Sequence, residues 1–129
     1  MDGRCETEPF YQLLGFQDGL DGDENVYLQL EIREDHLNNN GSLHGGVHAT
    51  MLDNVFGAMI YYKTGCRNLT ISLHVHYLAP AREGVLTAKG SFMQLGYKSA
   101  QLDGYIYDED DQLIAKGSGT FKLLREAKS

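Results

Sequence analysis

Several residue types are scarce in this chain of 129 residues, and each scarcity excludes a class of protein. The chain has no tryptophan, two prolines and two cysteines. Cys5 and Cys66 are too few for a disulfide scaffold and share no metal-ligand spacing, which favours a reducing compartment. Pro9 and Pro80 both lie near predicted element ends, so no proline-rich linker divides the chain.

Long apolar runs are also missing. The longest run, Val55 to Tyr62, is too short to span a bilayer. The first nine residues are acidic and lack the apolar stretch of a signal peptide. We therefore expect a cytoplasmic protein that does not enter a membrane.

Basic residues are few, with eleven Lys and Arg against eighteen Asp and Glu and a net charge of −7. This balance argues against nucleic acid and against an anionic membrane surface, because both require clustered cations. The charge is uneven: residues 1–64 hold eleven acids and three bases, whereas residues 65–129 hold seven acids and eight bases. A polyanionic ligand is therefore expected to bind the second half.

Length and composition predict one domain over residues 1–129, with a core at about 8–123. Hydrophobic residues make up 42% and charged residues 22%, which is typical of a globular chain. A second domain of ordinary size does not fit in this length. A core this small favours an active site that is completed by a partner subunit.

Hydrophobic periodicity predicts an α+β fold. Residues 8–15 predict a short helix and residues 16–24 a loop. A long buried helix is predicted from a glycine pair to about Tyr62, because this stretch is apolar on most sides. Strands are expected at residues 26–33, 71–77, 85–95, 99–107 and 112–123, the last two as a hairpin. The result is an antiparallel sheet of about five or six strands wrapped around one central helix.

Asp53 is the one formally charged residue between His44 and Lys63, in the middle of the predicted helix. Burying a carboxylate is costly and raises its pKa toward the range that suits a general base. The alternative is that Asp53 shares a polar stripe with Thr50 and Asn54 that faces solvent or a subunit interface. Spacing alone leaves both interpretations open.

The segment His44-Gly45-Gly46 opens the same helix. Its N–H groups lie in the first turn, where donors are unpaired and the helix dipole favours negative charge, as an oxyanion hole requires. The simpler explanation is a loop that needs positive φ before the helix.

Four of the five histidines form two pairs, His44 with His48 and His74 with His76. The spacing could hold a metal, but no cysteine or carboxylate completes a convincing ligand set. We expect ordinary polar or core histidines and no metal.

Several short motifs follow one another in a specific order. They are Asn38-x-x-Gly41-x-x-His44-Gly45-Gly46, Asp53, Thr70 leading an alternating strand, Tyr77-Leu-Ala-Pro80-Ala-Arg82, Gly96-Tyr97-Lys98 and a closing strand from Ala115 to Phe121. In this order they resemble the hot-dog-fold acyl-CoA thioesterases of the PaaI (phenylacetic acid degradation) type, over roughly residues 8–123. The resemblance implies a sheet wrapped around a long helix, homodimers that often pair into homotetramers, and active sites between subunits.

The resemblance also implies a catalytic role for each matching residue. Asp53 is the general base for water or the direct nucleophile, and Thr70 hydrogen-bonds this water or Asp53. The Gly45 N–H polarises the thioester carbonyl. Asn38, six residues before His44, positions water or the carbonyl, and His44 shapes the turn near the thiolate. Asn38, His44 and Gly45 of one chain are expected opposite Asp53 and Thr70 of the other.

In this family coenzyme A is part of the substrate, so no separate cofactor is expected. Its phosphates require local cations on an acidic chain, and the candidates in the less acidic half are Arg82 and Lys98, with Arg67 as a further one. Gly46, Gly96 and Tyr97 are further candidates for substrate contacts.

Two other functions remain to be weighed. A hot-dog dehydratase or hydratase acting on thioesters usually needs a histidine with an acid and a distinctive histidine-containing loop, which this chain lacks. A non-catalytic acyl-CoA binding module has no need for a buried base such as Asp53. The acyl group is left open, since Phe56, Met59, Tyr61 and Tyr62 suit an aryl or medium-chain pocket or simple core packing.

Overall fold

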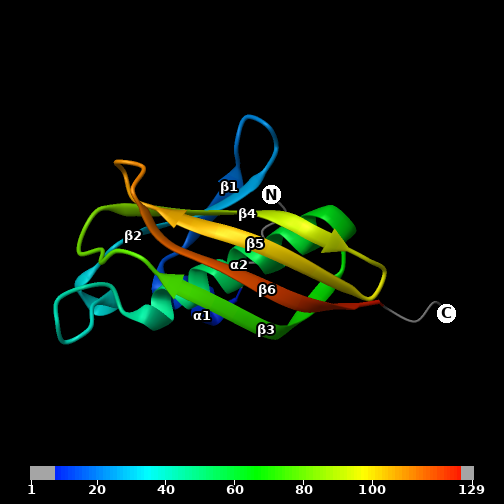
Figure 1. Cartoon of the computed structure of the whole chain (residues 1–129), viewed down its shortest axis with the longest axis horizontal. Helices are drawn as coiled ribbons and strands as arrows, with labels where there is room; N and C mark the ends of the chain where they lie inside the picture. The colour runs from blue at the N-terminus through cyan, green and yellow to red at the C-terminus, as the bar shows by residue number, and fades with distance from the viewer. Residues whose placement is uncertain (1–7, 126–129) are drawn as a thin grey trace.

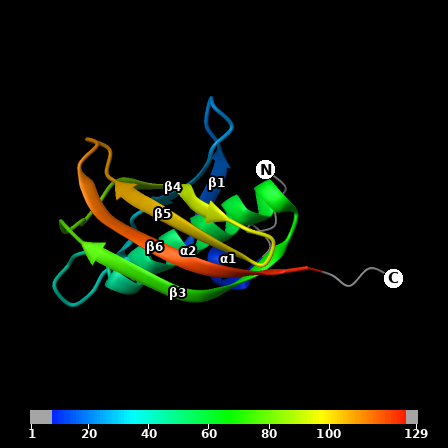
Figure 2. The same cartoon turned by 45° about the vertical axis from the view of Figure 1, so that its right-hand side comes forward.

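One six-stranded antiparallel sheet and one long helix dominate the computed structural model, which describes residues 8–125. The sheet has the order β1-β2-β4-β5-β6-β3 and curves around α2 (Figures 1 and 2). The elements are α1 (Pro9–Leu14), β1 (Gln17–Leu20), β2 (Val26–Glu31), the 3-10 turn η2 (Glu34–His36), α2 (Gly45–Thr64), β3 (Arg67–Tyr77), β4 (Val85–Leu95), β5 (Ser99–Tyr107) and β6 (Leu113–Leu124). This is the predicted α+β hot-dog architecture. None of the helices in residues 8–125 is long and apolar enough to cross a bilayer.

The core forms where α2 packs on the concave face of the sheet. Phe56 is fully buried and meets Phe121 of β6 edge to face, with ring centroids 6.0 Å apart. The sheet accepts this large ring because Gly104 of β5 lies beneath it, where a Cβ atom would approach the Phe56 ring to 2.5 Å. Glycine at this position therefore sets how closely α2 approaches the sheet and holds the helix along the middle of the structure.

Most predicted elements are confirmed. α1 begins at Pro9 and ends before Gly15, whose φ of 84° closes the helix as expected. β4 and β5 have the predicted bounds, and β5 pairs with β6 as a hairpin. β3 begins at Arg67, four residues earlier than the alternation at Ile71 indicated, because the strand is irregular between Thr70 and Ser72.

The prediction of a loop over residues 16–24 is wrong, because Gln17–Leu20 forms β1. This strand pairs antiparallel with β2, and Asp21 closes the turn by accepting hydrogen bonds from the N–H groups of Asp23 and Asn25. A four-residue edge strand shows no clear alternation of buried and exposed side chains, so pairing with β2 decides its structure.

The two edges of the sheet differ. β1 is short, whereas β3 offers eleven residues with one side unpaired. Leu69, Ile71 and Tyr77 on β3 are 55%, 61% and 54% exposed. A long, apolar, unpaired edge is a ready template for another strand. Cys66, just before this edge, is a free thiol, and Cys5 lies with the rest of residues 1–7 outside the described residues.

Candidate active site

The N-terminus of α2 offers one free backbone donor. His44 caps the helix, and its Nδ1 accepts a hydrogen bond of 2.9 Å from the Gly46 N–H. Within residues 8–125 the Gly45 N–H has no acceptor, as expected at the first position of a helix. The free donor at this helix terminus is therefore the N–H of Gly45, because the N–H of Gly46 is bonded to His44.

A loop with positive φ does not explain the glycine pair. Neither Gly45 nor Gly46 has a positive φ, and the residue of this region that does is Gly41, with φ 76°. Gly45 instead has a close neighbour, since a Cβ atom there would lie 3.2 Å from the Tyr77 hydroxyl oxygen and would push the Tyr77 side chain slightly away.

A groove of about 560 Å³ lies beside this helix terminus. Its lining residues are Asn38, Ser42, Leu43, Gly45, Gly46, His48, Tyr77, Leu78, Ala79 and Pro80. The Asn38 side-chain oxygen accepts from the N–H groups of Asn40 and Ser42 at 2.9 and 3.2 Å, which holds the loop in place. Asn38 thus lies beside Gly45, as predicted, with its carboxamide oxygen already used in the turn.

Tyr77 and His48 also line this groove, and the sequence interpretation gave neither of them a role at the site. The Tyr77 hydroxyl donates to the Gly45 carbonyl at 2.7 Å, and its ring meets His48 edge to face at 5.1 Å. His48 is buried, and this burial lowers the pKa of its imidazole and keeps it neutral. The available signal was the tyrosine that ends the strand in the Tyr77-Leu-Ala-Pro80 motif.

Asp53 lies half-buried between α2 and the edge strand β3. Its Oδ1 accepts a hydrogen bond of 2.6 Å from the Thr70 hydroxyl. Burial raises the pKa of the Asp53 carboxyl, while the Thr70 hydrogen bond acts against that rise. The predicted pairing of Asp53 with Thr70 is present, and a carboxylate in this environment is a stronger base than one in water.

The site residues fall into two separate groups within one chain. Asn38 and His44 lie with Gly45, and Thr70 lies with Asp53. Gly45 and Asp53 are eight residues apart on α2, which is about 12 Å along a helix. One reacting group of a small ligand cannot contact both groups of the same chain.

The proposed phosphate contacts are separated as well. Arg82 donates to the Asn40 carbonyl at 3.1 Å, near the groove. Gly96, Tyr97 and Lys98 form the β4–β5 turn at the opposite end of the sheet (Figure 1), where the Arg125 guanidinium lies 4.2 Å from the Tyr97 ring centroid. The eleven residues of β4 span roughly 35 Å, so one phosphate group reaches Arg82 and Lys98 only if they come from different chains.

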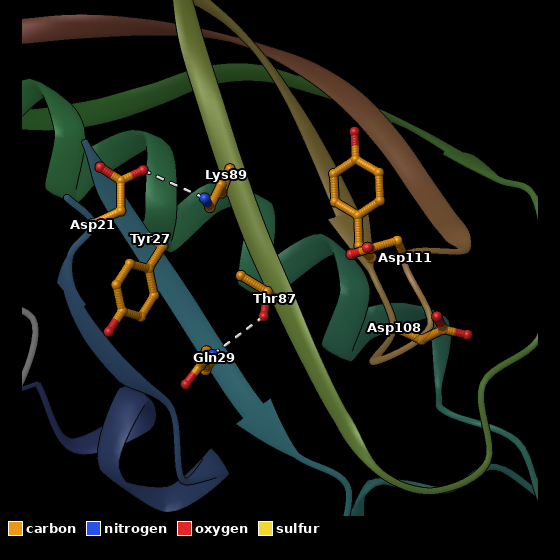
Figure 3. Close-up of a pocket in the computed structure, with 8 residues that line it drawn as sticks. Asp21, Tyr27, Gln29, Thr87, Lys89, Asp108 and Asp111 are labelled. Atoms are coloured by element: carbon orange, nitrogen blue, oxygen red, sulfur yellow. Dashed lines mark hydrogen bonds and ion pairs between the residues drawn. The ribbon is translucent and has the colours of Figure 1, made fainter. Parts of the chain in front are cut away.

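A second cavity, of about 460 Å³, lies on the sheet face away from α2 (Figure 3). Two pairs of its polar groups are bonded to each other: Lys89 pairs with Asp21 at 3.4 Å, and Gln29 donates to Thr87 at 3.3 Å. Backbone hydrogen bonds lower the pKa of Asp21. Residues 8–125 contain no cluster of three or more His, Cys, Asp or Glu side chains suited to a metal.

Comparison with known sequences identifies relatives of the chain. Residues 40–115 match the family model described as the thioesterase superfamily. The chain is 33% identical to acyl-coenzyme A thioesterase 13 of Homo sapiens over 67 residues, 49% of this chain and 48% of that protein, so the match spans about half of this relative. It is 30% identical to the medium/long-chain acyl-CoA thioesterase YigI of Salmonella typhimurium over 134 aligned positions, 89% of this chain and 85% of that protein.

Solved structures share the fold over nearly the whole chain. The BH2602 protein of Bacillus halodurans, crystallised with CoA, superposes with a TM-score of 0.85 at 27% identity, covering 92% of this chain and 80% of that one. The PaaI protein of the phenylacetic acid degradation operon of E. coli gives a TM-score of 0.85 at 17% identity, covering 95% of this chain and 88% of that one. At this identity the comparison shows that the two proteins share a fold.

Proposed function

Because the chain belongs to the thioesterase superfamily, we propose that it hydrolyses an acyl-CoA thioester to a free acid and coenzyme A. The observation that carries the proposal is the half-buried Asp53 carboxylate, held by Thr70 beside an unpaired edge strand. Such a carboxylate suits a base that removes a proton from water. Relatives named as acyl-CoA thioesterases, and a structural relative crystallised with CoA, support this substrate class.

The proposed site requires two chains. The free Gly45 N–H and the Asp53 carboxylate are about 12 Å apart along α2, too far to act on one carbonyl. A second chain that adds to the β3 edge would bring its own helix terminus toward Asp53. In this homodimer Asn38, His44 and Gly45 of one chain face Asp53 and Thr70 of the other.

The reaction follows from these positions. Asp53 takes a proton from water, and the hydroxide adds to the thioester carbon. The carbonyl oxygen then gains negative charge, which the Gly45 N–H at the positive end of the helix stabilises. The intermediate collapses, the C–S bond breaks, and the thiolate leaves near His44. The proton on Asp53 then passes to the thiolate, directly or through water, which releases coenzyme A as the thiol and restores the Asp53 carboxylate. The alternative is direct attack by Asp53, with water cleaving the resulting anhydride. Either route uses the chain's own residues, so we propose that no separate cofactor takes part.

The coenzyme is proposed to extend from the groove across the subunit surface. Gly46 lies in this groove and Arg82 beside it. Gly96, Tyr97 and Lys98 reach the same coenzyme in this proposal only from another chain, which suits a homodimer or homotetramer. A cytoplasmic location, where acyl-CoA is available, fits the proposal.

Asp53→Asn tests the function. The change keeps the shape of the side chain and an oxygen that accepts from Thr70, but it removes the base. We expect kcat for acyl-CoA hydrolysis to fall about 100-fold or more while the fold is retained. The assay is thiol release over a panel of acyl-CoAs, with circular dichroism as the check on folding.

Asp21→Asn is the matched control, since it also removes one carboxylate, on the opposite face of the sheet. It should keep the turnover of the wild type. Full turnover by Asp53→Asn on the best substrate would remove Asp53 from the mechanism.

A further inference from the structure

The first two peptide groups of α2 are held by side chains from three directions. The Gly45–Gly46 peptide accepts a hydrogen bond of 2.7 Å from the Tyr77 hydroxyl through its carbonyl. Its N–H donates to Nδ1 of His44 at 2.9 Å. Both polar groups of this peptide are therefore engaged, and the peptide plane cannot rotate without breaking one of these bonds.

The preceding peptide, between His44 and Gly45, carries the free N–H. Its carbonyl accepts from the Val47 N–H at 2.9 Å and from Nδ1 of His48 at 3.2 Å. A carbonyl can only accept, so His48 carries its proton on Nδ1. Burial lowers the pKa of His48, which keeps the imidazole neutral.

Tyr77 and His48 support each other. The two rings meet edge to face with centroids 5.1 Å apart and an interplanar angle of 89°. His48 is only 4% exposed, so its imidazole has little freedom to turn. Tyr77 can lie over the helix terminus because Gly45 has no side chain. One strand residue and one helix residue thus form a single packed unit behind the free donor.

We propose that Tyr77 and His48 are positioning residues that fix the direction of the Gly45 N–H toward the thioester oxygen. This inference rests on the proposed function, in which that N–H stabilises the oxyanion. A donor held in place before the reaction needs no reorganisation at the transition state. Hydrogen bonds to the carbonyl also polarise the peptide and strengthen its N–H as a donor.

Threonine and valine at position 48 form a matched pair for the test. In α2 itself, the hydroxyls of Thr50 and Thr64 donate to the carbonyls four residues earlier, Gly46 and Ile60, each at 2.7 Å. His48→Thr should therefore restore a donor to the His44 carbonyl, whereas His48→Val has the same shape without a donor. Both variants lose the imidazole, so its packing cancels in the comparison.

We expect kcat of His48→Thr to exceed that of His48→Val about fivefold, with similar KM, because the donor acts on the transition state. Tyr77→Phe should lower kcat by a similar factor. Thr64→Val, which removes a helix hydroxyl at the far end of α2, is the control and should leave kcat unchanged. Equal kcat values for His48→Thr and His48→Val would overturn the role of His48, and wild-type kcat in Tyr77→Phe would overturn that of Tyr77.

The NMR order parameter of the Gly45 amide separates this inference from the proposed function. It should be lower in His48→Val and Tyr77→Phe than in the wild type and His48→Thr. If no acyl-CoA is hydrolysed by the wild type, the proposed function fails, and the order parameters still decide whether the two residues hold this amide. An equally ordered amide in all four proteins would overturn the positioning role.

Discussion

The Asp53 carboxyl is subject to two opposing influences on its pKa. Burial between α2 and β3 raises the pKa, and the hydrogen bond from Thr70 lowers it, with burial the stronger of the two. A base must be deprotonated to act, so activity should be lost as the pH falls through the pKa of Asp53. In the proposed mechanism, Thr70 therefore determines how far the pH can fall before activity is lost.

Thr70→Val should raise the pKa of Asp53 further, because the carboxylate loses its only side-chain donor in the described part of the chain. The acidic limb of the pH profile of kcat/KM should then move to higher pH. Thr70→Ser keeps a hydroxyl, so the acidic limb of its pH profile should lie at the same pH as in the wild type. A limb that stays in place in Thr70→Val, or moves to lower pH, would show that another group controls it.

At the scale of elements, the contact between α2 and β3 includes a second unusual residue pair, one helical turn beyond Asp53. Gly57 lies inside α2, where glycine costs about 1 kcal/mol relative to alanine. The Asn68 side chain explains it: its Nδ2 donates to the Gly57 carbonyl at 3.2 Å, and its Oδ1 would lie 3.3 Å from a Cβ atom on Gly57. The strand side chain thus occupies the space that an alanine methyl would need.

A double-mutant cycle tests this account. In an Asn68→Ala background, Gly57→Ala should raise the free energy of unfolding by about 1 kcal/mol, since only helix propensity changes. In the wild-type background, Gly57→Ala should raise the free energy of unfolding by less, because the Asn68 side chain must move away from the new methyl group. Denaturant unfolding of the four proteins gives the coupling. Equal effects in both backgrounds would show that Asn68 does not account for the glycine.

At the scale of the whole molecule, the unpaired edge and the divided site have one common explanation. β3 exposes Leu69, Ile71 and Tyr77, and its Thr70 holds Asp53 beside this edge. The Gly45 donor is about 12 Å away along α2. A partner chain would both cover the edge and supply the missing half of the site.

Mixing two inactive variants tests the shared site. Gly45→Pro removes the N–H at the first helical position, where proline is tolerated, and the φ and ψ of His44, −62° and 135°, suit a residue before proline. In a mixed dimer of Gly45→Pro and Asp53→Asn, one site holds both lesions and the other is intact. Random reassociation makes half of the dimers mixed, so about a quarter of the wild-type activity should return.

Gly45→Ala is the control for the added carbon atoms, because it crowds Tyr77 but retains the N–H. Gly45→Ala should be more active than Gly45→Pro, and it should show this activity without any Asp53→Asn chain in the mixture. If the mixture stays inactive after subunit exchange has been verified by light scattering and mass spectrometry, each site belongs to one chain.

The sequence alone determined the elements whose signals are local. Alternating side chains and flanking turn residues predicted β4 and β5 with their observed bounds, and the apolar stretch after His44 predicted α2. The lone charge at Asp53 and the glycine pair indicated where to look for chemistry, since their positions in the helix follow from the immediate sequence. These properties depend on neighbours within a few residues.

The tertiary structure decided what depends on residues far apart in the chain. β1 became a strand through pairing with β2, and Tyr77 reached Gly45 across 32 positions. It also placed Arg82 and Lys98 at opposite ends of the sheet and divided the site residues into two groups. No local pattern encodes these distances, because they follow from how β3 runs back along α2 and how far each strand extends.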